Sequence, residues 1–168
     1  MGDDSNTARL KMAAYDCAIV QCEGWDGAMA PFEAELNGML GGPLPTKVGE
    51  TSRQDNWLVI RIAPRRFWLL CDGTPPIVDV DAELGCALPV GEGRVRLRLS
   101  GEGLKRLLER CGPIDWETLG EGRAVQTGFH RVPVLLLRSG TLECDLFVPR
   151  SLSESLRKWI ADASADGN

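Results

Sequence analysis

The clearest alternation of apolar and polar positions lies near the end of the chain, over residues 141–148. Its even-numbered positions are apolar, namely Leu142, Cys144, Leu146 and Val148, and they alternate with Thr141, Glu143, Asp145 and Phe147. Such an alternation is typical of a strand with one buried face. Residues 132–137 are apolar throughout, which predicts a strand buried on both faces. Ser139-Gly140 between the two stretches predicts a tight turn, so we expect an antiparallel hairpin.

A helix is predicted directly after this hairpin. Ser151 and Glu154 follow Pro149 with the spacing of a capping box, which satisfies backbone N–H groups in the first turn. The apolar residues that then recur at helical spacing are Leu152, Leu156, Trp159, Ile160 and Ala163. Because they form one stripe, the helix should pack on the sheet.

The rest of the chain shows the same two periodicities. Strands are predicted over residues 15–22, 57–62, 67–71, 94–99 and 123–129. Helices are predicted from Ala30 to Gly41-Gly42, over residues 79–88, and from the capping residue Ser100 to Gly112-Pro113. Residues 42–56 are rich in glycine, proline, threonine and serine, and we expect a loop there.

This order of elements predicts an α+β fold, in which an antiparallel sheet is covered by helices on one face. Strand, helix and hairpin follow one another in both halves of the chain, which indicates two similar units that share a core. The expected division is a disordered tail over residues 1–14, a single domain over residues 15–164 and a short tail over residues 165–168.

Composition and charge exclude several classes of protein. Of the 168 residues, 43% are hydrophobic and 26% are charged, and the formal net charge is −5. This balance argues against nucleic-acid binding, for which phosphate contacts need a basic face. No apolar run approaches the roughly 20 residues of a membrane-spanning helix, and residues 1–8 are acidic and polar. We therefore expect a cytoplasmic protein without membrane contact.

The six cysteines show no metal-binding spacing. They are Cys17, Cys22, Cys71, Cys86, Cys111 and Cys144, and no two form a CxxC pair. Because the chain also has only one histidine, we expect no zinc site. Most of the cysteines stand where the pattern calls for a small apolar residue, so we expect reduced, buried thiols.

Three arginines carry the strongest signal for binding. Arg94, Arg96 and Arg98 occupy alternate positions of one predicted strand, so their guanidinium groups project from one face. Such groups repel one another unless they are solvated or paired. The face is therefore either a solvated sheet surface or one that meets acidic groups of a partner or an anionic ligand, for which arginine is well suited.

Other candidate residues are explained more simply as structure. Ser100-Gly101-Glu102-Gly103 is similar to the start of a dinucleotide-binding loop, but Arg106 replaces the third glycine, which favours a plain helix entry. His130 has no nucleophile motif near it, which favours a packing or loop role over a catalytic triad. Asp79 and Asp81 lie in a turn-rich acidic segment that is typical of a solvated surface. We assign no catalytic, cofactor-binding or metal-ligating residue.

Five tryptophans are many for a chain of this length. Trp68 and Trp159 lie within core patterns. Trp25 and Trp116 lie in connecting segments, where we expect them to be partly exposed. Because exposed tryptophan is common at protein–protein interfaces, these two are the candidate interface residues.

Four passages occur together in an order found in one family. They are G-G-P-L-P-T (41–46), I-A-P-R-R-F-W-L-L (62–70), V-R-L-R-L-S-G-E-G-L-K-R-L-L-E-R-C-G-P-I-D (95–115) and V-P-R-S-L-S-E-S-L-R-K-W-I (148–160). From about Cys17 to Ala163 the chain thereby resembles the gamma subunit of heterotetrameric sarcosine oxidase. The resemblance implies a fold similar to the folate-binding domains of the glycine-cleavage aminomethyltransferase.

The resemblance also implies a place in a complex with alpha, beta and delta subunits. In that family the alpha subunit holds NAD and a folate-binding domain, and the beta subunit holds FAD and covalently attached FMN. The complex oxidatively demethylates sarcosine to glycine, forms hydrogen peroxide and passes the methyl carbon to tetrahydrofolate. The gamma subunit supplies no known catalytic residue, so this chain is expected to be non-catalytic and to bind no cofactor itself.

Two points stay open from the sequence. The segment between Cys71 and Arg94 is short for this family and the cysteine count is high, which leaves the substrate open between sarcosine and a related compound such as N-methylglutamate. The alternative to a subunit is a free-standing folate- or anion-binding module that uses the Arg94, Arg96 and Arg98 face. An obligate subunit is expected to expose apolar surface and to self-associate or be marginally stable alone.

Overall fold

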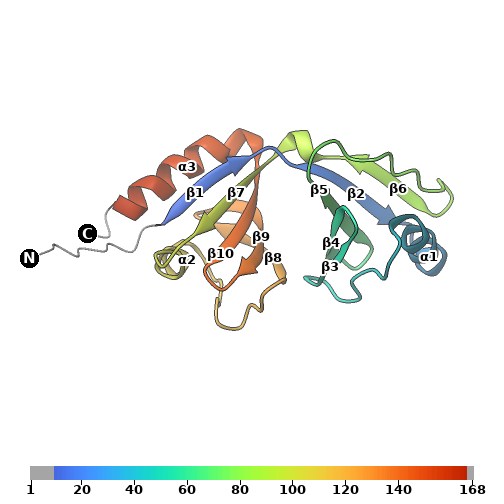
Figure 1. The fold of residues 1–168 in the computed structure, drawn as a ribbon, viewed down its shortest axis with the longest axis horizontal. Coiled ribbons are helices and arrows are strands. Elements are labelled where there is room, and N and C mark those ends of the chain that lie inside the picture. Colours follow the sequence, from blue (N-terminus) through green and yellow to red (C-terminus); the bar gives the residue numbers. More distant parts are fainter. Residues whose placement is uncertain (1–9, 166–168) are drawn as a thin grey trace, which may run out of the picture.

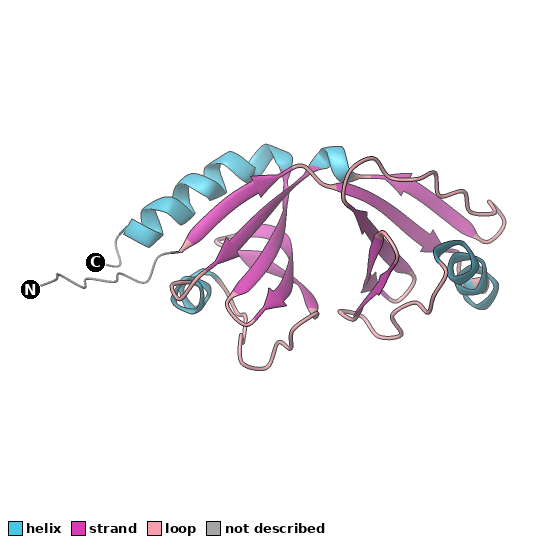
Figure 2. Ribbon diagram, in the orientation of Figure 1, coloured by secondary structure: helices cyan, strands magenta, loops and turns pink. Residues whose placement is uncertain are grey.

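The computed structural model describes residues 10–165, which fold into two five-stranded antiparallel sheets and three α-helices (Figures 1 and 2). Sheet A has the strand order β1-β7-β10-β9-β8 and sheet B the order β3-β4-β5-β2-β6. The predicted α+β class is confirmed, with the antiparallel strands divided between two sheets.

Each sheet is built from five strands that are not all consecutive in the chain. Sheet A contains β1 (Lys11–Tyr15), β7 (Arg94–Ser100), β8 (Ala124–Phe129), β9 (Val132–Gly140) and β10 (Glu143–Pro149). Sheet B contains β2 (Ala18–Gly24), β3 (Thr51–Gln54), β4 (Trp57–Ala63), β5 (Arg66–Cys71) and β6 (Gly85–Pro89). The helices are α1 (Met29–Leu40), α2 (Leu104–Cys111) and α3 (Arg150–Ala165), and a 3₁₀ turn, η1, spans Gly91–Gly93.

The two halves of the chain repeat one order of elements. The first half runs β2-α1-β3-β4-β5 and the second runs β7-α2-β8-β9-β10. In each half the last strand returns to pair with the first, β5 with β2 and β10 with β7. This is the two-unit arrangement that the order of strands and helices in the sequence indicated.

Each half also places one strand in the sheet of the other half. β1 precedes β2 but pairs with β7, and β6 precedes β7 but pairs with β2. The continuous segments β1–β2 and β6–β7 therefore pass from one sheet to the other and cross between them (Figure 1). At the crossing the Val90 N–H donates to Ile19 O at 2.9 Å, and a Cβ on Gly91 would lie 2.1 Å from Cys17 O. The close approach of two backbones therefore requires glycine at position 91.

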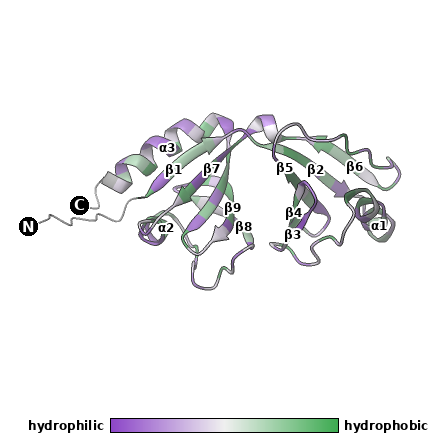
Figure 3. Cartoon of the chain, in the orientation of Figure 1, coloured by the Kyte–Doolittle hydropathy of each residue, from purple (hydrophilic) through white to green (hydrophobic). Residues whose placement is uncertain are grey.

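Three groups of buried apolar side chains hold the layers together. One joins sheet A to α2 and α3, and a second joins sheet B to α1. The third lies between the sheets, and its buried members are Ile19, Ile60, Ile62, Trp68, Leu70, Ala124, Leu135, Leu137 and Phe147. In Figure 3 hydrophobic and hydrophilic residues are interleaved along α3, as expected of a helix with one buried side. Each sheet is thus covered by helix on one face and packs against the other sheet on its opposite face.

Two strands lie where the sequence pattern predicted other structure. β3 falls inside the predicted loop over residues 42–56, because its sequence TSRQ has no apolar alternation and it is held by pairing with β4. β6 takes the last four residues of the helix predicted over residues 79–88, and the residues before it form no helix. There Gly85 lies so close to β2 that a Cβ would be 2.4 Å from Glu23 O. Both predictions were wrong because an edge strand is defined by a backbone partner, which periodicity does not reveal.

Some local boundaries also differ from the prediction. Ser100 does not cap α2, which begins after Gly103 without a side-chain cap. Ser151 lies inside α3, which begins one residue earlier. The turn between β9 and β10 falls at Thr141-Leu142, since β9 continues to pair as far as Gly140. The elements themselves were predicted correctly in these three places.

Part of the segment predicted as a tail, residues 1–14, forms a strand. Residues 1–9 lie outside the described residues, but Lys11–Tyr15 forms β1 and pairs with β7, so the prediction is wrong for residues 11–14. The side chains of β1 are mostly exposed, and its backbone hydrogen bonds rather than an apolar pattern hold it in place. Of the predicted tail over residues 165–168, Ala165 is the last residue of α3 and the others lie outside the described residues.

A candidate functional site between the two sheets

The arginine face of β7 points into the space between the two sheets. The strand alternates between buried and half-buried residues, with Arg94, Arg96 and Arg98 at the half-buried positions. On the neighbouring strand β10, Asp145 lies opposite Arg98 and Phe147 lies opposite Arg96. The prediction that the three guanidinium groups share one face is therefore confirmed, but the face lies inside the fold rather than on its outer surface.

A buried carboxylate pairs two of these arginines. Asp145 is fully buried, with 0% of its side chain exposed. Arg96 Nη2 donates to Asp145 Oδ2 at 2.7 Å, while Arg98 Nε and Nη2 donate to the two oxygens of the same carboxylate at 2.9 and 3.2 Å. This bonding raises the pKa of Arg98. The repulsion expected between neighbouring guanidinium groups is thus relieved by charge-assisted hydrogen bonds within the chain.

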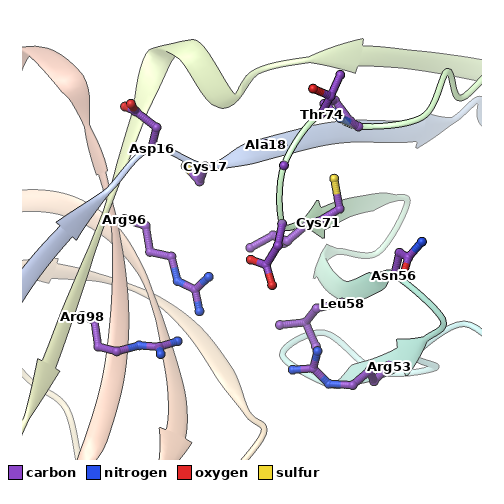
Figure 4. A pocket seen from close by; sticks show the side chains of 14 residues that line it. Asp16, Cys17, Ala18, Arg53, Asn56, Leu58, Cys71, Thr74, Arg96 and Arg98 are labelled. Atoms are coloured by element: carbon purple, nitrogen blue, oxygen red, sulfur yellow. The ribbon is translucent and has the colours of Figure 1, made fainter.

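Arg96 and Arg98 line a cavity of about 610 Å³ between the sheets. Figure 4 shows their side chains extending from sheet A, while Arg53 extends from sheet B toward the same space. Leu58 and Leu70 contribute an apolar part of the wall. The site therefore combines three guanidinium groups with an apolar surface.

Two cysteines, Cys17 and Cys71, also line this cavity, and neither is a reactive thiol. Burial raises the pKa of Cys17, although Arg96 and Arg150 act in the opposite direction. Burial also raises the pKa of Cys71, and Asp72 adds to the effect. Both groups are therefore mainly neutral thiols near neutral pH, which are weak nucleophiles.

Arg94 is separated from the other two arginines and faces a second cavity, of about 540 Å³. Its guanidinium carbon lies 5.4 Å from the centre of the Trp68 ring, a cation–π contact. Gln126 and Arg131 also line this cavity. The arginine face predicted as one site is thus divided between two cavities.

The two candidate interface tryptophans have different environments. Trp25 is 43% exposed, and its indole N–H donates to Ala82 O at 2.8 Å. Trp116 is only 6% exposed and lies under Arg138, whose guanidinium carbon is 4.3 Å from the ring centre. The expectation that Trp116 is partly exposed is therefore wrong, because Arg138 from β9 holds the connecting segment against sheet A. Its sequence position alone carries no sign of this contact.

The other residues considered from the sequence have structural roles. His130 is in a tight turn with φ of 47°, and its ring stacks on Trp159 at 3.9 Å between ring centres. Asp81 Oδ1 accepts a hydrogen bond from the Glu83 N–H, and Asp79 is exposed. All six cysteines are free thiols, and three of them, Cys22, Cys111 and Cys144, are buried.

Neither a metal-binding cluster nor a membrane-spanning helix is found in the part of the chain that the structure describes. Residues 10–165 contain no group of three or more His, Cys, Asp or Glu side chains that could hold a metal ion. Within the same residues no helix has both the length and the apolar content to cross a bilayer.

Sequence reasoning missed two residues that define the cavity. Asp145 was recognised only as a polar position of an alternating strand, and Arg53 lay in a predicted loop. The position of Asp145 opposite Arg98 depends on the strand register, which the sequence pattern did not provide. The alternation placed Asp145 on the polar face of its strand, so no local pattern indicated that its carboxylate is buried and needs a cationic partner.

Comparison with solved structures defines the class of fold. Aminomethyltransferase T of the glycine cleavage system from Bartonella henselae matches this structure with a TM-score of 0.56 and 16% sequence identity. The match covers 89% of this chain and 45% of the aminomethyltransferase chain. The chain therefore has an aminomethyltransferase-like α+β fold. No protein-family model matches the sequence.

A more similar relative is the sarcosine oxidase subunit gamma of Corynebacterium sp. (strain U-96). It is 28% identical over 141 residues, which cover 79% of this chain and 69% of the relative. A chain of the heterotetrameric sarcosine oxidase from Corynebacterium sp. U-96, solved in complex with pyrrole 2-carboxylate, has a TM-score of 0.86 and 23% identity over 97% of this chain and 87% of that one. The resemblance to the sarcosine oxidase gamma subunit family is confirmed.

Proposed function

We propose that this chain is the small, non-catalytic subunit of a heterotetrameric complex of the sarcosine oxidase type. The observation that carries the proposal is the 28% identity to a sarcosine oxidase gamma subunit over 79% of the chain. The shared fold with a chain of a solved heterotetrameric sarcosine oxidase supports it. The partners are then the alpha, beta and delta subunits of such a complex.

The reaction of the proposed complex is the oxidative demethylation of sarcosine or a related N-methyl amino acid. Its methyl carbon passes to tetrahydrofolate, and FAD, FMN and NAD are held by the partner subunits. A non-catalytic role for this chain is supported by what its reactive side chains do. Asp145 is engaged by two arginines, His130 is stacked on Trp159, and burial raises the pKa of Cys22 to about 12.

A cytoplasmic location is part of the proposal. All six cysteines are free thiols in the described part of the chain. Free thiols are the normal state of cysteine in a reducing compartment. The same compartment supplies the nicotinamide and folate cofactors that the complex would use.

The test is capture of the tagged full chain from an extract of its own cells. We expect recovery of larger chains identified by mass spectrometry as sarcosine oxidase alpha and beta subunits, with the visible absorbance of flavin. The recovered complex should form hydrogen peroxide from sarcosine or another N-methyl amino acid, whereas the chain alone should not. A colourless chain recovered without those subunits would contradict the proposal.

Trp25 is the predicted contact residue in that complex. Trp25→Ala removes an exposed indole, and we expect it to lower the amount of flavin-containing chains recovered. Met39→Ala is the matched control, because Met39 is also 43% exposed but was not predicted to lie in the interface. Equal recovery with both variants would mean that Trp25 is outside the contact surface.

A further inference from the structure

We propose that the cavity between the sheets binds a small molecule through a carboxylate or phosphate group. The site consists of Arg96 and Arg98 on β7, Arg53 at the end of β3, and the walls formed by Leu58 and Leu70. This inference goes beyond the proposed function, since it concerns a ligand of this chain itself. Its test does not depend on assembly of the complex.

The arginines of this cavity retain capacity to donate hydrogen bonds. Asp145 has two oxygens for two guanidinium groups, which together carry ten N–H bonds. Among the described residues, Arg96 Nε is buried and has no hydrogen-bond partner. A buried donor without a partner carries a free-energy cost, which a bound oxyanion nearby would reduce by reorienting the guanidinium group.

The arginines around the cavity are only partly neutralised. Asp145 neutralises only one of the two arginines it contacts, and Glu143 lies beyond hydrogen-bond distance, 3.8 Å from Arg98 Nε. Arg53 adds a further positive charge and forms no ion pair with the residues that the structure describes. Like charges that face one shared space are stabilised when an anion lies between them.

Two carboxylates also line the cavity, and they limit its preference for anions. Asp16 is paired with Arg150, whose Nη2 lies 3.0 Å from Asp16 Oδ1. Asp72 is exposed at the cavity wall. Asp72 repels an incoming anion. Removing its charge should therefore strengthen anion binding, whereas removing Arg53 should weaken it.

The shape of the arginine side chains and the cavity volume indicate the chemical class of the ligand. The planar guanidinium group matches the geometry of carboxylate and phosphate oxygens, which it can bind with two parallel hydrogen bonds. The cavity volume of about 610 Å³ is in the range of small-molecule sites and exceeds what an inorganic ion needs. The apolar walls accordingly suit an anion attached to an uncharged body.

The experiment is a titration of the full, isotopically labelled chain, followed by backbone amide chemical shifts. The probes are inorganic phosphate and sodium benzoate. Benzamide, which has the same ring as benzoate but no charge, is the control for binding through the ring alone. We expect saturable shifts at the amides of Ala18, Cys71 and Gly73, which line the cavity. Saturation by phosphate alone would restrict the ligand to compounds with a phosphate group, and saturation by benzoate alone would restrict it to carboxylates. Either result supports binding of an oxyanion by the arginines.

Three variants separate a built site from general charge attraction. Arg53→Ala should raise the dissociation constant about tenfold, the order expected for one charge-assisted hydrogen bond. Asp72→Asn should lower it. Arg65→Ala makes the same charge change as Arg53→Ala but at the β4–β5 turn, where Arg65 is paired with Asp26, and should leave binding within about twofold.

Several results would overturn the inference. They are the absence of saturable shifts with both probes, shifts confined to other surfaces, and equal weakening by Arg53→Ala and Arg65→Ala. Saturable binding of an acidic peptide together with no binding of either probe would also overturn it, because the face would then serve a partner chain.

Discussion

The crossing of the two long strand pairs can be tested by adding one methyl group, in the variant Gly91→Ala. The Cβ of alanine would lie 2.1 Å from Cys17 O and 2.9 Å from Ile19 N. Both contacts are to backbone atoms, so no side chain can rotate away. One of the two strands would have to move by about 1 Å, at the point where Val90 N–H donates to Ile19 O.

The expected loss of stability follows from these contacts. Overpacking of a close backbone contact costs about 1–3 kcal/mol, and the weakened hydrogen bond between Val90 and Ile19 costs about 1 kcal/mol more. The reduced freedom of the unfolded chain returns about 0.4–1 kcal/mol. We therefore expect a net destabilisation of about 1–3.6 kcal/mol, which lowers Tm by roughly 2–14 °C in a chain of this size.

Thermal unfolding followed by far-ultraviolet circular dichroism measures this change. Gly93→Ala is the matched control, since Gly93 lies in the same 3₁₀ turn and its Cβ would meet nothing within 4 Å. Its Tm should equal or slightly exceed that of the unmodified chain. If Gly91→Ala and Gly93→Ala have the same Tm, the close crossing is not a constraint on the folded state.

Two further predictions concern the buried polar and thiol groups. Asp145→Asn leaves Arg96 and Arg98 without their carboxylate and should cost about 3 kcal/mol in urea unfolding, near the low end for a broken buried pair because Arg98 is 36% exposed. Glu143→Gln alters the 3.8 Å contact with Arg98 and an exposed hydrogen bond from Ser139 Oγ, and it should cost less than about 1 kcal/mol, so equal costs would refute the buried-pair assignment. Burial raises the pKa of Cys22 and Cys111 to about 12 and also raises that of Cys144, so their thiolate fraction is very small at pH 8. No more than three thiols should therefore react with Ellman's reagent in the folded chain, against six in urea, and rapid reaction of all six without urea would show that the core is open.

Much of the fold was predictable because local patterns and local structure agree. The strands β4 and β5 follow the predicted stretches 57–62 and 67–71. Helix α1 ends at Leu40 and is followed by Gly41, whose left-handed φ of 77° is typical of a glycine C-cap. The strands β3 and β6 could not be predicted in this way. They are edge strands whose side chains carry no regular alternation, so only their hydrogen-bonded neighbours define them.

The candidate site was predictable only in part. The alternation of Arg94, Arg96 and Arg98 correctly placed three guanidinium groups on one face of a strand. The division of that face between two cavities was not predictable, because it depends on how sheet B packs against sheet A. For the same reason the burial of Trp116 beneath Arg138 could not be expected from the sequence.

The sequence by itself determined the α+β class, the faces of most strands and helices, and the resemblance to a sarcosine oxidase gamma subunit. These properties depend on residues close together in the chain or on motifs read in order. Only the tertiary structure decided that each half places a strand in the sheet of the other, and that Asp145 meets two arginines from another strand. Such contacts join segments far apart in the sequence, and their register is decided by the packing of whole sheets rather than by any local periodicity.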